Sequence, residues 1–239
     1  MKTINMVQYK LGDGKTILEP KYENIEYMQT SKNFIIETNN KMGIISSKNK
    51  ETIVEPIYDE LRLIDNKRNY FLVKKNDLYG IIEVIDDKKN DIVYIENEKI
   101  GVDISKYEEN GIKNGYILLN RLVPIMQNGK WGFFDLKLRR TSKFRYDSIG
   151  SLSTNGNNTY GLLILPEYEL IVVQKNRKYA FIDEDGNEDI VPFVFDKMYL
   201  RISSGEKKYY MTTSEGSYNI MQSLEKNNIK KKTTSELFN

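Results

Sequence analysis

The sequence predicts an all-β protein, and three features lead to this prediction. The 239-residue chain holds a single alanine, Ala180, although alanine is the best helix former. It holds 28 isoleucines and 17 tyrosines, which favour the pleated, half-buried surface of a sheet. Asn, Asp and Gly recur between short apolar runs, a rhythm typical of short strands joined by tight turns. We therefore expect many strands and no helix of consequence.

A first repeated element accounts for part of this rhythm. A proline, a spacer, an aromatic residue and an acid occur at 19–23 and again at 55–59, with the two prolines 36 residues apart. Looser copies lie at 144–147, which lacks the proline, and at 192–196, which has one extra residue. A proline at the entrance of a strand removes no ladder hydrogen bond. We expect each copy to be a strand whose aromatic residue points into the core.

A second repeated element consists of a large side chain, a small residue and two apolar residues. The copies lie at 41–45, 78–82, 130–135 and 178–183, with a degenerate fifth copy at 216–221. A glycine inside a strand indicates that another backbone or ring approaches closely, and we expect the preceding large side chain to cover the bare position. Such a unit cannot bury its apolar face alone, so the units are expected to stack on one another.

The segment Gly129–Asp135, Gly-Lys-Trp-Gly-Phe-Phe-Asp, resembles the signature of the WG (Trp-Gly) β-repeat family, which is common in bacterial proteins. Pro56, Tyr58 and Asp59 are similar to the latter half of that signature. The resemblance covers about residues 12–222 in four to five units, of which only one keeps the tryptophan. It implies an array of four to five antiparallel β-meander repeats, closed like a propeller or open like a solenoid. It also implies an interaction module without shared catalytic residues.

The phase of the repeat separates two groups of aromatic and small residues. Those in phase are assigned to the core, since they occupy equivalent places in successive units: Tyr22, Tyr58, Tyr79, Gly80, Trp131, Gly132, Tyr146 and Tyr179. Those out of phase are candidates for a surface patch, because tyrosine anchors many interfaces: Tyr107, Tyr116, Tyr160, Tyr168, Tyr209 and Tyr210.

The repeat also predicts the domain organisation. We expect one repeat domain over residues 1–224 and a polar, basic tail over 225–239. The tail breaks the repeat phase, so it is expected to be frayed or to form a short helix that caps the array through Leu237 and Phe238.

Composition excludes several kinds of chemistry. The chain has no cysteine and no histidine, which removes disulfides, thiolate metal sites, the cysteine nucleophile and the usual general base. We therefore predict that the protein is not an enzyme and uses no cofactor and no metal. A hydrolase that works with carboxylates alone is an alternative, but it needs two facing acids about 5 to 10 Å apart. No motif selects such a pair from the 34 acids.

Two short motifs are better explained as turns. Residues 12–16, Gly-Asp-Gly-Lys-Thr, resemble the end of a phosphate-binding loop, but Tyr9 stands where that loop requires a glycine. Residues 183–188 resemble a calcium loop, but they supply neither the glycine at the sixth position nor the bidentate glutamate at the twelfth. The pair Asp185-Gly186 predicts a hairpin turn instead.

The charge pattern points to a protein partner. The chain has 36 basic and 34 acidic residues, a net charge of +2, whereas a nucleic-acid binder usually has a stronger basic bias. The candidate partner-binding residues form a basic segment, with 137 and 139 on one face of a strand and 143 and 145 likewise on one face. We expect this segment to steer an acidic protein partner. It consists of Lys137, Arg139, Arg140, Lys143 and Arg145.

These observations combine into a functional prediction. The start of the chain lacks the apolar stretch of a secretory signal, and no apolar run is long enough to span a bilayer. We expect a soluble cytoplasmic bacterial protein that binds neither membranes nor nucleic acid and acts as a non-catalytic protein–protein interaction module. The alternatives are an immunity protein that neutralises a cognate bacterial toxin and a carboxylate-only hydrolase on a β-scaffold.

Overall fold

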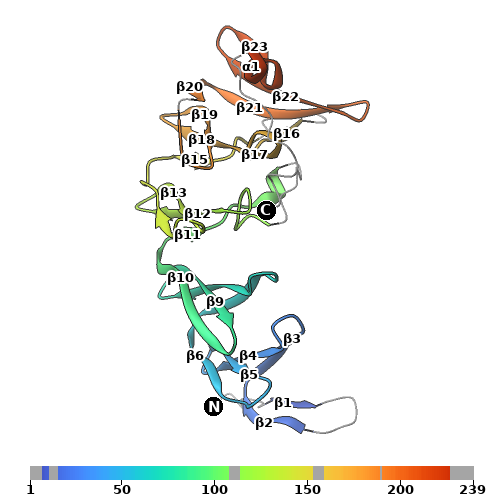
Figure 1. Cartoon of the computed structure of the whole chain (residues 1–239), viewed down its shortest axis with the longest axis vertical. Coiled ribbons are helices and arrows are strands. Elements are labelled where there is room, and N and C mark those ends of the chain that lie inside the picture. The colour runs from blue at the N-terminus through green and yellow to red at the C-terminus, as the bar shows by residue number, and fades with distance from the viewer. Residues whose placement is uncertain (1–6, 11–15, 108–113, 153–158, 189, 227–239) are drawn as a thin grey trace, which may run out of the picture. The chain divides into compact units, whose positions relative to one another are not determined.

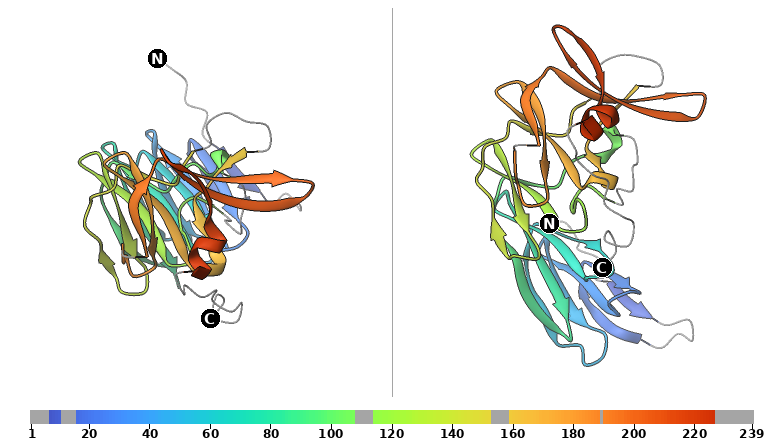
Figure 2. Two further views of the ribbon diagram at one scale, coloured as in Figure 1. Left: turned by 90° about the horizontal axis from the view of Figure 1, so that it is seen from above. Right: turned by 45° about the horizontal axis from the view of Figure 1, so that its top comes forward.

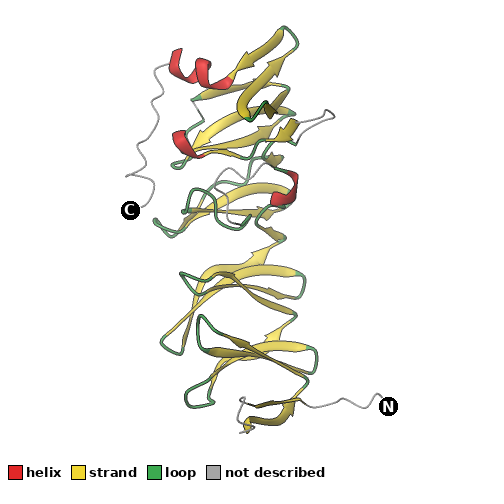
Figure 3. Cartoon of the chain, turned by 90° about the vertical axis from the view of Figure 1, so that its right-hand side faces the viewer, coloured by secondary structure: helices red, strands yellow, loops and turns green. Residues whose placement is uncertain are grey.

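The computed structural model describes residues 7–10, 16–107, 114–152, 159–188 and 190–226. Over these residues the chain is mostly strand, arranged in antiparallel sheets (Figure 1, Figure 3). Within the described residues, helix is confined to α1 (Ile220–Lys226) and two short 3-10 turns, η1 (Ile104–Lys106) and η2 (Pro166–Tyr168). The prediction of an all-β repeat fold is confirmed.

The chain divides into two compact units, residues 1–98 and 99–239. The first unit contains a two-stranded sheet followed by two four-stranded sheets, each built from strands that are consecutive in the sequence. The two-stranded sheet consists of β1 (Val7–Lys10) and β2 (Thr16–Tyr22). The first four-stranded sheet consists of β3 (Asn24–Met28), β4 (Asn33–Thr38), β5 (Lys41–Ser46) and β6 (Thr52–Tyr58). The second consists of β7 (Glu60–Asp65), β8 (Tyr70–Lys75), β9 (Leu78–Ile85) and β10 (Lys88–Asn97).

The second unit contains three sheets, in which insertions add short strands to the same plan. The first consists of β11 (Lys99–Ile100), β12 (Leu122–Gln127), β13 (Lys130–Asp135) and β14 (Arg140–Thr141). The next consists of β15 (Ser148–Ile149), β17 (Ile164–Leu165), β18 (Leu170–Lys175), β19 (Lys178–Asp183) and β20 (Val191–Phe195). The last consists of β16 (Thr159–Gly161), β21 (Lys197–Ser203), β22 (Glu206–Thr213) and β23 (Gly216–Asn219).

The long hairpin of four sheets, β4–β5, β8–β9, β12–β13 and β18–β19, has the same turn chemistry. An asparagine with positive φ stands first in each of these four turns, and the next residue also has positive φ. Two central residues with positive φ define the type I′ turn, whose twist matches that of the flanking strands. This turn sets the register of the long hairpins, and it occurs at Asn39-Asn40, Asn76-Asp77, Asn128-Gly129 and Asn176-Arg177.

The small residue of the second sequence element lies at a recurrent irregularity of the ladder. Between the pairs Met42↔Tyr58 and Ile44↔Val54, the single residue Gly43 faces the three residues 55–57. The fourth strand therefore arches over the third. Equivalent arches, each of three residues against one, face Gly80 (94–96), Gly132 (143–145) and Ala180 (192–194).

The arches explain why these positions are small. A Cβ atom on Gly43 would lie 2.5 Å from the Val54 carbonyl oxygen, and one on Gly80 would lie 2.7 Å from that of Val93. At Gly132 the nearest atoms would be 3.1 Å away, one of them on the Phe144 ring. The close approach predicted from sequence is therefore made by the backbone of the arch. The residue before Gly132, Trp131, pairs instead with Tyr146 at the end of the arch.

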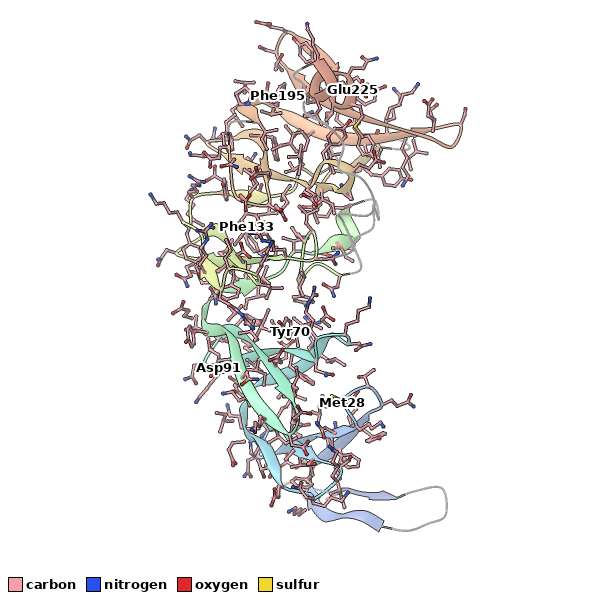
Figure 4. The ribbon with its side chains drawn as sticks, viewed as in Figure 1. Met28, Tyr70, Asp91, Phe133, Phe195 and Glu225 are labelled. Carbon is pink, nitrogen blue, oxygen red and sulfur yellow. The ribbon has the colours of Figure 1, made fainter. Side chains whose placement is uncertain are left out.

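Apolar cores lie between consecutive sheets within each unit. In the first unit, Ile35 packs with residues of the following sheet, such as Phe71 and Val73, whereas its neighbours Phe34 and Ile36 pack against β2. In the second unit, Ile171 and Val173 face one core and Val172 the next. Strands buried on both faces read as continuous apolar runs, which is the pattern seen here. Met28, Phe133 and Phe195, labelled in Figure 4, belong to three of these cores.

The acid that ends the first sequence element links neighbouring sheets. Asp59 lies directly after β6 and forms an ion pair with Lys41 on β5 of the same sheet. It also accepts a hydrogen bond, at 2.9 Å, from the Asn76 amide in the hairpin turn of the following sheet. Asp147 does the same with Lys130 and with the turn amides of residues 176 and 177. These hydrogen bonds lower the pKa of both carboxyl groups. The lysine and the acid of the repeat signature are thus ion-pair partners.

The degenerate fifth copy differs from the others. Strand β23 ends at Asn219, and the chain continues directly as α1. Ile220 and Leu224 lie one helical turn apart and are both buried in the last core, which accounts for the helix. No strand follows β23 among the residues that the structure describes. The glycine-rich segment before Thr16 and the predicted capping residues Leu237 and Phe238 lie outside the described residues.

Candidate functional site

The basic segment lies at an edge of the first sheet of the second unit. Residues 136–139 form a turn after β13, and β14 pairs with β13 on one side only. The Asp135 carboxylate accepts hydrogen bonds from the amides of Lys137 and Leu138, at 2.9 and 3.0 Å. The prediction that 137 and 139 share one face of a strand is wrong, because this capped turn replaces the strand at those positions. The same prediction for 143 and 145 is also wrong, because β14 ends at Thr141 and these residues belong to the arch over Gly132.

Four cations of the basic segment are exposed. Lys137, Arg139, Arg140 and Lys143 are solvent-exposed, and none of them forms an ion pair with any residue in the described parts of the chain. Leu138, between them, is 45% exposed. The segment therefore presents positive charge and some apolar surface to solvent, with no internal carboxylate to neutralise it.

Arg145 has a different role from the other four. Its Nε lies 2.9 Å from Glu188, which also contacts Lys175 at 3.5 Å, and its guanidinium lies over the Tyr146 ring. Glu188 belongs to the segment between β19 and β20, so this ion pair joins two consecutive sheets of the unit. Arg145 is thus mainly structural, although the sequence placed it with the binding residues.

Arg121 is a charged residue that sequence reasoning missed. It makes a bidentate contact with Asp135, at 3.0 and 2.6 Å, and also contacts Glu184 at 3.1 Å and Asp185 at 3.2 Å. Its hydrogen bond to Asp135 raises the pKa of Arg121. Burial opposes ionisation of Asp135, but the hydrogen bonds from Arg121 and from the turn amides outweigh it, so the pKa of Asp135 is lowered. No spacing in the sequence links residue 121 to residues 184 and 185.

The same network concerns the carboxylates that a carboxylate-only hydrolase or a metal site would need. Asp135, Glu184 and Asp185 converge on one guanidinium and are held there as its counter-ions. The candidate calcium loop forms a turn: Gly186 has φ +83°, and the Asp183 carboxylate accepts hydrogen bonds from the amides of Asp185 and Asn187. Within the described ranges, no group of three or more Asp or Glu side chains is arranged to hold a metal ion.

The residues assigned to the repeat core lie in the core or at its margin. Tyr58 and Tyr146 are each 1% exposed, and Trp131 is 9% exposed in the first core of the second unit. Tyr22 is buried as well, and the glycines lie under the arches. Tyr79 and Tyr179 are only partly buried.

The tyrosines assigned to a surface patch do not form one. Tyr168 is 3% exposed and lies in the last core, and Tyr209 packs against the same core. The Tyr107 hydroxyl donates a hydrogen bond to the Ile149 carbonyl, and burial raises the pKa of Tyr107 to about 12. Tyr116 packs against Gly101, Tyr160 is 37% exposed on β16, and Tyr210 stacks on Tyr199. Tyr107, Tyr116, Tyr160 and Tyr168 lie in the insertions of the second unit and Tyr209 and Tyr210 on β22 of the last sheet, so repeat phase is a poor guide to them.

The comparison with protein families supports the resemblance. Residues 42–79 match the model of the WG containing repeat. This segment runs from Met42 on β5 to Tyr79 on β9, that is, from one large residue of the second sequence element to the next. The chain therefore carries a WG-type repeat, and the architecture described above is that of a β-repeat protein.

Other comparisons identify no relative of known function. No curated protein matches the sequence. Solved structures with some likeness include Kluyveromyces lactis Hsv2, at 12% identity over 82% of this chain with a TM-score of 0.29. A complex of S. cerevisiae Dbp5 with Nup159 and Gle1 matches at 9% identity over 92% of the chain with a TM-score of 0.31. The tricorn protease matches at 9% identity over 90% with a TM-score of 0.27. The chain spans 61%, 66% and 24% of those chains, and at these scores the matches carry no argument.

No described helix is long and apolar enough to cross a membrane.

Proposed function

We propose that this protein is a cytoplasmic, non-catalytic binding module whose partner is a protein with an acidic surface. The observation that carries the proposal is the basic segment. Its four exposed cations have no ion-pair partner in the described residues, whereas the nearby cations Arg121, Arg145 and Lys175 are all paired. Exposed charges of one sign accelerate the encounter with a complementary surface and orient it.

The turn that carries two of these cations, Lys137 and Arg139, supports the proposal. Asp135 holds the turn through two backbone hydrogen bonds and is itself fixed by Arg121, which is 11% exposed. The charges of Lys137 and Arg139 are therefore presented on an ordered turn, and a partner has less backbone entropy to remove on binding there. The absence of histidine and cysteine from the whole sequence favours binding over turnover.

Capture from the native lysate tests the proposal. The protein is immobilised, bound components are identified, and the experiment is repeated with the double reversal Arg139→Glu, Arg140→Glu. The matched control reverses Lys32 and Lys67, two exposed turn lysines of the first unit, which changes the net charge by the same amount.

We expect one acidic protein to be retained by the wild type and by the control but not by the double reversal. Identification of that protein as a toxin would specify the function as immunity. Retention of nucleic acid, or equal retention of the partner by the double reversal, would contradict the proposal.

A further inference from the structure

The last sheet of the second unit, β16–β21–β22–β23, buries one face only. Met198 and Leu200 on β21 and Met211 on β22 are buried in the last core, which they share with α1 and the preceding sheet. Since side chains alternate along a strand, the residues between them point to the opposite face. No core cluster of the described residues lies on that face. We call it the outer face.

Two tyrosines occupy the centre of the outer face. Tyr199 and Tyr210 are cross-strand partners, and their rings stack with centroids 5.4 Å apart and planes 24° apart. On the other side of Tyr199 its partner is Gly161 on β16, which has no side chain. The stacked pair therefore stands on the sheet without a β16 side chain beside it, and both rings are only partly buried.

Cations surround this pair. Lys197 and Arg201 flank Tyr199 on β21, and Lys208 pairs with Arg201 across the hairpin. Lys197 and Arg201 are exposed and form no ion pair with any residue in the described ranges. Lys208 contacts Glu206 at 3.1 Å, and that contact raises its pKa. Among the described strand residues of this face, Glu206 is thus the one acid, against three cations.

The remaining side chains of the face are uncharged hydrogen-bonding groups. Thr159 lies beside Arg201, Thr212 beside Lys197 and Ser217 beside Thr212, as their strand partners show. The β21–β22 hairpin extends away from the other strands of the second unit (Figure 2), so this face is presented on a projecting ribbon. A terminal repeat needs only a polar outer face to stay soluble. A stacked aromatic pair flanked by three cations, of which Lys197 and Arg201 have no ion-pair partner in the described ranges, goes beyond that need.

We propose that the outer face is a second docking site, and that it binds an extended acidic segment of a protein. Carboxylates of the segment would pair with Lys197, Arg201 and Lys208, and its apolar groups would pack on the tyrosine pair. Single-stranded nucleic acid is less favoured, because successive bases need separate aromatic platforms. Here the two rings cover each other. The residues differ from those of the basic segment, so the inference stands independently of the proposed function.

Fluorescence anisotropy with a labelled glutamate-rich peptide tests this site in the full chain. We expect the double reversal Lys197→Glu, Arg201→Glu to weaken peptide binding by about tenfold, because two attractive charges become repulsive. Lys207→Glu is the matched control for the single reversal Lys197→Glu: it changes the net charge by the same amount, and Lys207 neighbours Lys208 in the sequence but lies on the other face of the hairpin. We expect Tyr210→Ala to weaken binding and Tyr210→Phe to preserve it.

The outcomes separate this inference from the proposed function. Weakening by the Lys197 and Arg201 reversal, with little effect of Arg139→Glu, Arg140→Glu, supports the outer face as a site. Weakening by the Arg139 and Arg140 reversal alone would overturn the inference and leave the proposed function intact. Tighter binding of a labelled oligothymidylate of equal charge, lost with the Lys197 and Arg201 reversal, would also overturn it.

Discussion

At the scale of single residues, Trp131 belongs both to the repeat signature and to the buried core. It is the one tryptophan of the chain, it is 9% exposed, and it pairs with the buried Tyr146. We predict that Trp131→Ala lowers the free energy of unfolding by roughly 3 to 5 kcal/mol, the usual cost of truncating a buried large aromatic side chain. Urea denaturation followed by circular dichroism measures this. Tyr218→Ala, at a position 41% exposed, is the control and should cost far less. Unchanged stability of Trp131→Ala with loss of partner binding would mean that Trp131 is a surface anchor.

Two features favour glycine at position 150: its backbone conformation and the close approach of a tyrosine ring. Its φ is +79°, and a Cβ atom there would lie 2.6 Å from the ring of Tyr107. Gly205 has nearly the same φ, +80°, but open space around it. Both alanine variants bear the cost of a left-handed backbone, about 1 kcal/mol. We predict that Gly150→Ala costs about 1 to 3 kcal/mol more than Gly205→Ala, because the partly buried Tyr107 ring, which packs against the core, must move. Trp131 fluorescence during urea denaturation reports both, and equal costs would refute the argument.

Asp135 makes the stability of the second unit depend on acid pH. Its pKa is lower in the folded protein than the ordinary value of 3.8, so it stabilises the fold above that value. This contribution disappears as the pH falls through the folded pKa. We predict that Asp135→Asn is less stable than the wild type at neutral pH and that the difference shrinks below about pH 3.8. A difference that stays constant down to acid pH would show that Asp135 acts without its charge.

At the scale of elements, the arch explains the small residue in the first four copies of the second sequence element. The sequence predicted a close approach at Gly43, Gly80 and Gly132, since only a short side chain was repeated there. The sequence did not reveal the arch itself, in which three residues of the fourth strand face one residue of the third. A shift in strand register does not change the alternation of apolar and polar residues that the sequence shows. Ala180 shows that an arch can accommodate a methyl group, as it is fully buried in the same position.

The arches predict a graded response to a single added methyl group. Gly43→Ala places its Cβ atom 2.5 Å from the Val54 carbonyl oxygen and 2.8 Å from the Pro56 nitrogen, both backbone atoms. We predict a loss of about 1 to 3 kcal/mol, as for other overpacked sites. Gly132→Ala meets its neighbours at 3.1 Å, two of them side-chain atoms, and should cost less. Thermal unfolding followed by circular dichroism compares them. A cost at Gly132 equal to that at Gly43 would contradict the proposed role of the arch.

At the scale of the whole molecule, local patterns predicted the fold far better than the candidate site. The repeated elements and the turn residues specify strand after strand, so the fold class and most core aromatics followed from them. The site depends on contacts distant in sequence. Arg121 meets Glu184 and Asp185, and Arg145 meets Glu188, only after consecutive sheets stack. The five basic residues of the segment therefore look like one exposed patch in the sequence, although Arg145 forms an ion pair within the second unit.

Charge is also distributed unevenly between the two units. Residues 1–98 contain 15 basic and 17 acidic residues, a net charge of −2, whereas residues 99–239 contain 21 and 17, a net charge of +4. Both proposed binding faces lie in the second unit. The near-neutral total of +2 conceals this difference. The net charge of the whole chain therefore argues against a charged partner, whereas the net charge of the second unit does not.

The central claim is that the exposed cations of the basic segment recruit an acidic protein. The association rate constant with the captured partner, measured by stopped flow as salt is raised, tests it most directly. We expect association of the wild type to slow as ionic strength increases, and Arg139→Glu, Arg140→Glu to associate more slowly at low salt and to depend less on salt. Identical rates and identical salt dependence for the two proteins would show that the basic segment is only a solvated turn.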